Sequence, residues 1–185
     1  GSAAAFINHA SIAEPETALD LFRRETRYFI HNSMLFNLEL FKIQTNELDQ
    51  QTNYNEINDK RNFDSKTPEE KYEFLKQLQG ELQAFYLKLR AKLNSEGNSE
   101  LNQLISAVRS SMHAVKSIKD IGSNITNLSS SSKEIKYQFF LHQKKETEEL
   151  YLKLNLFLNT EKSSDFEELR IQFDTIQKNY TTALN

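Results

Sequence analysis

Apolar residues recur along this chain at intervals of three and four, the spacing that places side chains on one face of an α-helix. The pattern predicts five helices, near residues 15–48, 67–94, 99–128, 133–159 and 164–184. The third is the most regular, because one apolar face continues from Leu101 to Leu128. Helices joined by short loops pack antiparallel. The sequence therefore predicts an all-α, antiparallel up-and-down bundle of about five long helices.

The ends of the first three helices carry local signals. Pro15 suits the first position of a helix, where its missing N–H costs nothing. Thr67 and Glu70 have the spacing of a capping box. The segment Ser95-Glu96-Gly97-Asn98 is expected to end the second helix, so the third is expected to begin at residue 99. The polar, asparagine-rich residues 49–66 are expected to form the longest loop, because such a composition buries little apolar area.

The second half of the first predicted helix is apolar on nearly all sides. Seven of the ten residues from Met34 to Ile43 are apolar. A helix with this pattern is buried on more than one side. A central position in the bundle and a hidden surface for a partner both explain it.

The composition sets the class of protein. The 185 residues suffice for one domain with its own core, assigned to residues 15–185, and residues 1–14 are expected to be a tag remnant and an N-terminal arm. Only four glycines and two prolines interrupt the chain, which favours long helices. The formal net charge of −3 gives no global reason to bind nucleic acid or an anionic membrane. No apolar run approaches the ~20 residues of a membrane span, so this segment is not expected to insert into a membrane directly.

The sequence lacks the motifs of common catalytic and cofactor sites. There is no cysteine, which excludes disulfides and thiolate metal sites. A di-iron carboxylate bundle needs Glu-x-x-His pairs, and no glutamate stands three residues before His31, His113 or His142. Neither a glycine-rich phosphate loop nor a nucleophile elbow is present. The sequence therefore predicts a protein that is not an enzyme and that needs no cofactor.

The most informative polar feature lies on the third predicted helix. Steps of four, three, four and four place five residues on one ridge, namely Arg109, His113, Lys116, Asp120 and Asn124. Guanidinium, imidazole and ammonium groups on one face suit an anion or a protein partner. A solvated face opposite the core explains the same pattern. Lys116 and Asp120 also have the spacing of an i,i+4 ion pair, which stabilises an exposed helix by only a few tenths of a kcal/mol.

Two segments of the chain resemble one bacterial family. The run from Ser106 to Ile121, SAVRSSMHAVKSIKDI, is similar to the signature helix of the PhoU-like domain in bacterial sodium/phosphate cotransporters. Pro15-Glu16-Thr17-Ala18-Leu19, followed by Arg23, Arg24 and Glu25, is similar to the helix that begins this cytoplasmic domain. The resemblance implies a PhoU-like fold with one complete three-helix repeat, residues 15–129, and two helices of a partial second repeat.

The resemblance also implies a function and a location. It implies a non-enzymatic regulatory domain of a sodium-dependent phosphate transporter, acting through protein contacts in phosphate uptake and homeostasis. The implied partner is the membrane-embedded transporter portion of the same longer protein, at the cytoplasmic face of the bacterial inner membrane; self-association is a further expectation, and nucleic acid is not expected as a partner. Many relatives bind metal clusters through a Glu/Asp-x-x-x-Asp motif, but Lys119 and Ser123 occupy those positions here, so no metal cluster is expected.

Two other functions fit the same bundle. One is the ligand-sensing domain of a bacterial membrane receptor, which would be flanked by a membrane helix on each side. The other is a free-standing helical adaptor, whose parent protein would contain no membrane segment. The sequence of the whole parent protein separates these alternatives from a transporter domain.

Overall fold

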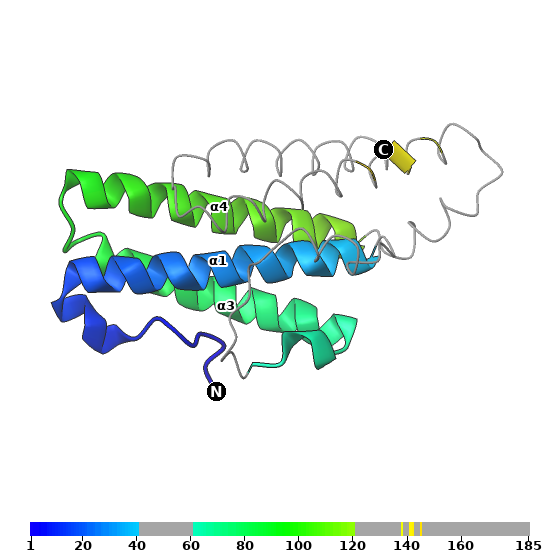
Figure 1. Cartoon of the computed structure of the whole chain (residues 1–185), viewed down its shortest axis with the longest axis horizontal. Coiled ribbons are helices and arrows are strands. Elements are labelled where there is room, and N and C mark those ends of the chain that lie inside the picture. The colour runs from blue at the N-terminus through cyan, green and yellow to red at the C-terminus, as the bar shows by residue number, and fades with distance from the viewer. Residues whose placement is uncertain (41–60, 121–137, 139–140, 143–144, 146–185) are drawn as a thin grey trace, which may run out of the picture.

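The computed structural model describes residues 1–40 and 61–120, together with the four residues 138, 141, 142 and 145. Its elements are two 3-10 helices, η1 (His9–Ala13) and η2 (Phe63–Ser65), and the α-helices α1 (Pro15–Leu40), α3 (Pro68–Leu89) and α4 (Ser95–Asp120). Figure 1 shows the three α-helices side by side, with α3 running opposite to α1 and α4. The described residues form no strand. This part of the chain is therefore all-α, as predicted, with an up-down-up order.

The other two predicted helices are described only at isolated positions. Gln138, Leu141, His142 and Lys145 are each helical, and all four belong to the helix predicted near 133–159. The rest of that helix and the whole of the helix predicted near 164–184 lie outside the described residues, as do residues 41–48 of the first predicted helix and residues 121–128 of the third.

The second half of α1 is buried on several sides, as its apolar pattern predicts. Met34, Phe36 and Leu38 are each at most 1% exposed, although Phe36 lies on the side of the helix opposite to Met34 and Leu38. Polar residues of this half, Ser33 and Asn37, are buried as well. Ser33 satisfies its hydroxyl by donating to the carbonyl of Phe29 at 2.7 Å.

The capping box at the start of α3 is confirmed. The backbone N–H of Glu70 donates to the hydroxyl of Thr67 at 3.2 Å, and the backbone N–H of Thr67 donates to the Glu70 carboxylate at 3.4 Å. These two bonds satisfy donors that the first turn of a helix leaves without a partner. The predicted start near residue 67 is therefore correct to one residue.

The predicted boundary between α3 and α4 is wrong. Helix α3 ends at Leu89 rather than near residue 94, and α4 begins at Ser95 rather than 99. Asn94 accepts a hydrogen bond from the N–H of Gly97 at 2.8 Å, which is the interaction of an N-cap residue. The Asn98 amide donates to the carbonyls of Arg90 and Leu93, both at 3.0 Å.

Gly97 explains why the segment resembled a helix end. A Cβ at this position would lie 3.1 Å from the Leu93 side chain and 3.3 Å from the capping oxygen of Asn94. The glycine thus makes room for a tight α3–α4 turn, whereas the sequence pattern had indicated a helix stop. Polar residues with a glycine are typical both of the end of a helix and of the turn that begins the next one, so only the cap geometry distinguishes the two cases.

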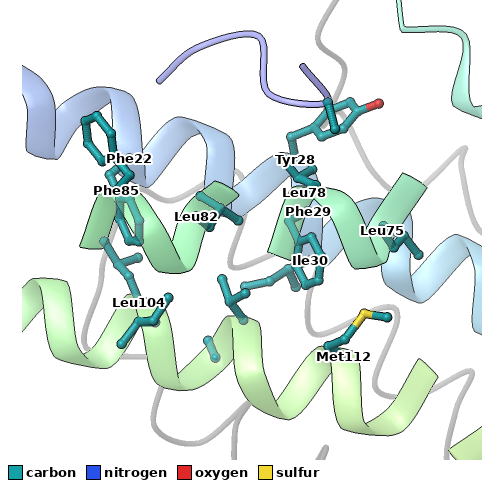
Figure 2. Close-up of a cluster of buried hydrophobic side chains, with 14 of the residues drawn as sticks. Phe22, Tyr28, Phe29, Ile30, Leu75, Leu78, Leu82, Phe85, Leu104 and Met112 are labelled. Atoms are coloured by element: carbon teal, nitrogen blue, oxygen red, sulfur yellow. The ribbon is translucent and has the colours of Figure 1, made fainter. Parts of the chain in front are cut away.

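The core forms where the three α-helices meet (Figure 2). Fully or almost fully buried side chains come from each of them, including Phe22 and Phe29 of α1, Leu82 and Phe85 of α3, and Leu104 of α4. The rings of Phe22 and Phe85 stack with centroids 6.1 Å apart and planes 11° apart. This packing fixes the rotation of α1 against α3 and so decides which faces remain for function.

Crossing a bilayer requires a long and apolar helix, and the described helices differ from this. None of them combines the length and the apolar character that crossing a bilayer requires.

Candidate functional site

The structure places the predicted ridge on the outer side of α4. Arg109, His113 and Lys116 are all exposed. Asp120 is the last residue of α4, but its side chain lies outside the described residues, and so does Asn124. The predicted Lys116–Asp120 ion pair therefore stays a prediction.

A stripe of α3 lies directly beside the ridge. Arg109 donates from Nε to the side-chain oxygen of Gln83 at 3.3 Å, and its guanidinium lies 5.6 Å from the ring centroid of Tyr86. The Tyr86 hydroxyl in turn donates to the side chain of Asn102 on α4 at 2.8 Å. The two helices thus present one continuous surface, with aromatic rings between charged groups.

Two further cations flank the same surface. Arg90, just after α3, lies 5.8 Å from the centroid of the Tyr86 ring, and Lys119 of α4 lies 4.2 Å from the centroid of the Tyr72 ring. Such cation–π contacts contribute about 0.5–1 kcal/mol each at exposed sites. They hold the long side chains against the surface without neutralising them, because an aromatic ring carries no charge.

We call this surface the basic face. It consists of six exposed side chains, namely Lys76, Arg90, Arg109, His113, Lys116 and Lys119. Lys76 belongs to it because it stands four residues after Tyr72, on the same side of α3. Among the described residues, none of the six is in an ion pair. Five of the six carry a full positive charge, whereas the whole chain has a formal net charge of −3. Within the described residues, this side of the α3–α4 pair therefore carries a cluster of positive charges that are not neutralised by ion pairs.

The resemblance implies two metal-ligand positions, which are occupied by Lys119 and Ser123. Lys119 is exposed and its ammonium faces the Tyr72 ring, while Ser123 lies outside the described residues. The described part of the chain contains no group of three His, Asp or Glu side chains that could hold a metal ion.

A second organised site lies on the opposite side of α3. Residues 1–8, which we call the arm, run back along the bundle from η1 (Figure 1). Two carboxylates face the arm, and both accept hydrogen bonds from its backbone N–H groups. Glu25 of α1 accepts from Ala5 at 2.7 Å and from Phe6 at 2.9 Å. Glu81 of α3 accepts from Ala3 at 2.8 Å and also contacts the hydroxyl of Ser2.

Arg61 connects the arm to the start of α3. Its Nη1 donates to the Glu25 carboxylate at 2.7 Å and to the carbonyl of Ala3 at 3.2 Å. Its guanidinium also covers the ring of Tyr28 at 3.4 Å from the centroid. The Glu25 side chain is 0% exposed and that of Arg61 only 11%, so this ion pair is shielded from water.

The aromatic side chain of the arm lies against two guanidinium groups. Arg24 lies 4.0 Å and Arg61 5.0 Å from the centroid of the Phe6 ring. Ala3 is the one residue of the arm that is buried, at 4% exposure. We call the surface formed by Arg24, Glu25, Tyr28, Arg61 and Glu81 the arm groove.

Sequence reasoning missed the arm groove. Glu25 lies between Phe22 and Phe29 on the apolar stripe of α1, at steps of three and four. A carboxylate inside such a stripe is a signal of a buried polar site. Its partners could not be deduced, because the arm and Arg61 are far from it in sequence and have no periodic pattern.

A cavity of about 700 Å³ opens at the other end of the bundle, between the start of α1 and the α3–α4 turn. Four carboxylates and two cations line it, namely Glu16, Asp20, Glu96, Glu100, Arg23 and Lys92. Arg23 donates to Glu100 and to Asp20, each at 2.6 Å. The hydrogen bond to Glu100 is the main cause that raises the pKa of Arg23 above its ordinary value.

Comparisons with known proteins add no identity to this geometry. No protein-family model, no curated protein and no solved structure matches the chain.

Proposed function

We propose that this chain is a non-enzymatic helical module that acts through protein contacts, and that its basic face binds an acidic segment of a partner protein. The observation that carries the proposal is the concentration of six exposed basic side chains on the α3–α4 surface of a chain with a net charge of −3. A partner whose potential is complementary is steered to such a surface and held in one orientation.

The aromatic rings favour a protein segment over a free anion. Tyr72 and Tyr86 are half-buried, and their rings offer apolar area between the cations. A helix or loop with acidic and apolar side chains uses both features, whereas a simple anion uses only the charges. Lys116 and Arg109 lie near the middle of this surface on α4, two turns apart.

The specific form of the proposal follows from the resemblance of residues 106–121 and 15–25. In that form the chain is the PhoU-like regulatory domain of a sodium/phosphate cotransporter, and the acidic segment belongs to the cytoplasmic side of the membrane-embedded portion. The five-helix PhoU-like architecture, with one full repeat and a partial second, is part of this proposal.

The experiment reverses charge on the basic face. In cells that carry the full-length transporter, the Arg109→Glu/Lys116→Glu variant is expected to lose regulation of phosphate uptake. The matched control is Lys88→Glu, a reversal of an exposed charge on the opposite side of α3, which is expected to leave regulation unchanged. Helix content measured by circular dichroism must stay equal in all variants. Unchanged regulation in the double variant contradicts the proposed role of the basic face.

The cavity at the end of the bundle is the observation that favours a second candidate, the ligand-sensing domain of a membrane receptor. Four carboxylates against two cations give its lining a net charge of −2, which suits a small cationic ligand. Thermal denaturation with a polyamine such as spermidine tests this candidate. A saturable rise in Tm that Glu96→Gln removes supports it, and an unchanged Tm contradicts it.

A further inference from the structure

The arm groove holds the arm mainly by its backbone. Three backbone N–H groups of the arm donate to Glu25 and Glu81 at 2.7–2.9 Å, and one backbone carbonyl accepts from Arg61 at 3.2 Å. These donors and acceptors match a peptide chain rather than any one side chain. We propose that the arm groove is a peptide-binding site, that the arm is its resident ligand, and that a segment of a partner protein takes its place when the arm is released.

The side-chain contacts define which segment fits. Ala3 is buried at 4% exposure, so a small residue is needed there. Ala5 is exposed and places no demand on its side chain. Phe6 lies on the guanidinium groups of Arg24 and Arg61, which favour an aromatic ring. The site therefore selects a small residue followed three positions later by an aromatic residue.

The charge of the arm groove also fits a peptide. Two carboxylates, Glu25 and Glu81, stand beside two guanidinium groups, Arg24 and Arg61, so the site is neutral overall. A free anion or cation would meet a like charge within the same groove, whereas a peptide backbone offers N–H groups to the carboxylates and a carbonyl to the guanidinium.

The arm can leave without stranding a charge. Glu25 and Arg61 pair with each other at 2.7 Å, so both keep a counter-ion when the backbone of the arm is removed and water enters. An unpaired buried charge would have made departure of the arm far more costly. Ala3 is the one fully buried residue of the arm, and Ala4, Phe6 and Ile7 are partly exposed where they pack against the core, so the arm lies on the surface of the core and is not part of its interior. Polar contacts of this kind are readily exchanged for the same contacts with another chain.

The experiment must weaken the resident arm, because a ligand tethered by a short linker has an effective concentration in the millimolar range. The chain of 185 residues carries Ala5→Pro and Phe6→Ser, which remove one backbone N–H and the aromatic ring. The probe is a fluorescent peptide with the sequence of residues 2–8, and binding is measured by fluorescence anisotropy. The control chain carries Ala10→Ser, an exposed change outside the arm.

The expected result is binding of the peptide to the Ala5→Pro/Phe6→Ser chain about ten-fold or more tighter than to the control chain. A peptide that carries the same two changes should bind this chain at least about ten-fold more weakly than the original peptide. Adding Arg24→Ser to the chain should also weaken binding of the original peptide, because it removes one of the two guanidinium groups against the Phe6 ring, and circular dichroism checks that the fold persists.

Three results overturn the proposal. The first is that the original peptide binds the Ala5→Pro/Phe6→Ser chain and the control chain with equal affinity. The second is that the original and the changed peptide bind the Ala5→Pro/Phe6→Ser chain with equal affinity. The third is that no peptide binds the Ala5→Pro/Phe6→Ser chain although circular dichroism shows it to be folded. Because the arm groove and the basic face lie on opposite sides of α3, this outcome is independent of the function proposed for the basic face.

Discussion

Replacing Glu25 by glutamine tests the most shielded ion pair among the described residues. The glutamine oxygen can still accept the N–H groups of Ala5 and Phe6, now at 2.7 and 2.9 Å from the carboxylate. Its NH₂ group, however, faces Arg61, whose Nη1 lies 2.7 Å from the second carboxylate oxygen. Two donors then oppose each other, and the guanidinium loses its counter-charge at a site where it is only 11% exposed.

The burial of this ion pair determines how much free energy of unfolding the Glu25→Gln variant is expected to lose. Removing one partner of a buried ion pair destabilises a protein by about 3–5 kcal/mol. Release of the arm lets water reach Arg61 and limits the loss, so we expect about 3 kcal/mol, the lower end of this range. In urea denaturation followed by circular dichroism, with a slope of about 2 kcal/mol/M, the midpoint should fall by about 1.5 M.

The matched control is Glu81→Gln. Glu81 binds the same arm through the Ala3 N–H at 2.8 Å, but it is half-buried and forms no ion pair among the described residues. We expect this control to lose about 1 kcal/mol, the value of one ordinary hydrogen bond. The double variant Glu25→Gln/Arg61→Gln should recover part of the loss, because no unpaired charge remains. Equal losses for Glu25→Gln and Glu81→Gln would refute the shielded ion pair.

Three further predictions concern the helices and use the same denaturation assay. Thr67→Ala removes one side of the capping box of α3 and should cost about 0.5–2 kcal/mol; a loss below this range would show that the cap contributes nothing in solution. Phe85→Ala empties a fully packed site and should cost about 3–5 kcal/mol, whereas Leu87→Ala, at a residue 49% exposed, should stay within about 0.5 kcal/mol; similar losses would contradict the rotation of α3. Asn98→Ala leaves the carbonyls of two α3–α4 turn residues without their side-chain donor and should cost about 1 kcal/mol, with Ser99→Ala as the neutral exposed comparison.

Helix positions followed from the sequence where the signal was local or periodic. The start of α3 was predictable because Thr67 and Glu70 act within a single turn. The burial of α1 from Met34 onward was predictable because apolar residues surround it. The start of α4 was not predictable, because Gly97 and its polar neighbours are equally typical of a helix end. The Asn94 cap in addition depends on the path of the preceding turn.

The two surfaces differ in how far the sequence revealed them. The ridge on α4 was visible because Arg109, His113 and Lys116 repeat at helical spacing on one element. Its extension across α3 to Tyr72 and Tyr86 was not, because the contact depends on the rotation of one helix against another. The arm groove joins residues 36 positions apart, Glu25 and Arg61, and no pattern within a single helix encodes such a pair.

Helix α3 is the element that the two surfaces share, and this determines how variants must be interpreted. Its buried stripe, which includes Leu78 and Leu82, contacts the core. One flank carries Tyr86, which lies against Arg109 of the basic face, and the other flank carries Glu81 of the arm groove. A core variant of α3 therefore disturbs both surfaces, whereas a variant on one flank disturbs one of them. Because a packed helix moves as a rigid unit, loss of both proposed binding functions from a single flank variant would indicate that α3 has moved as a whole.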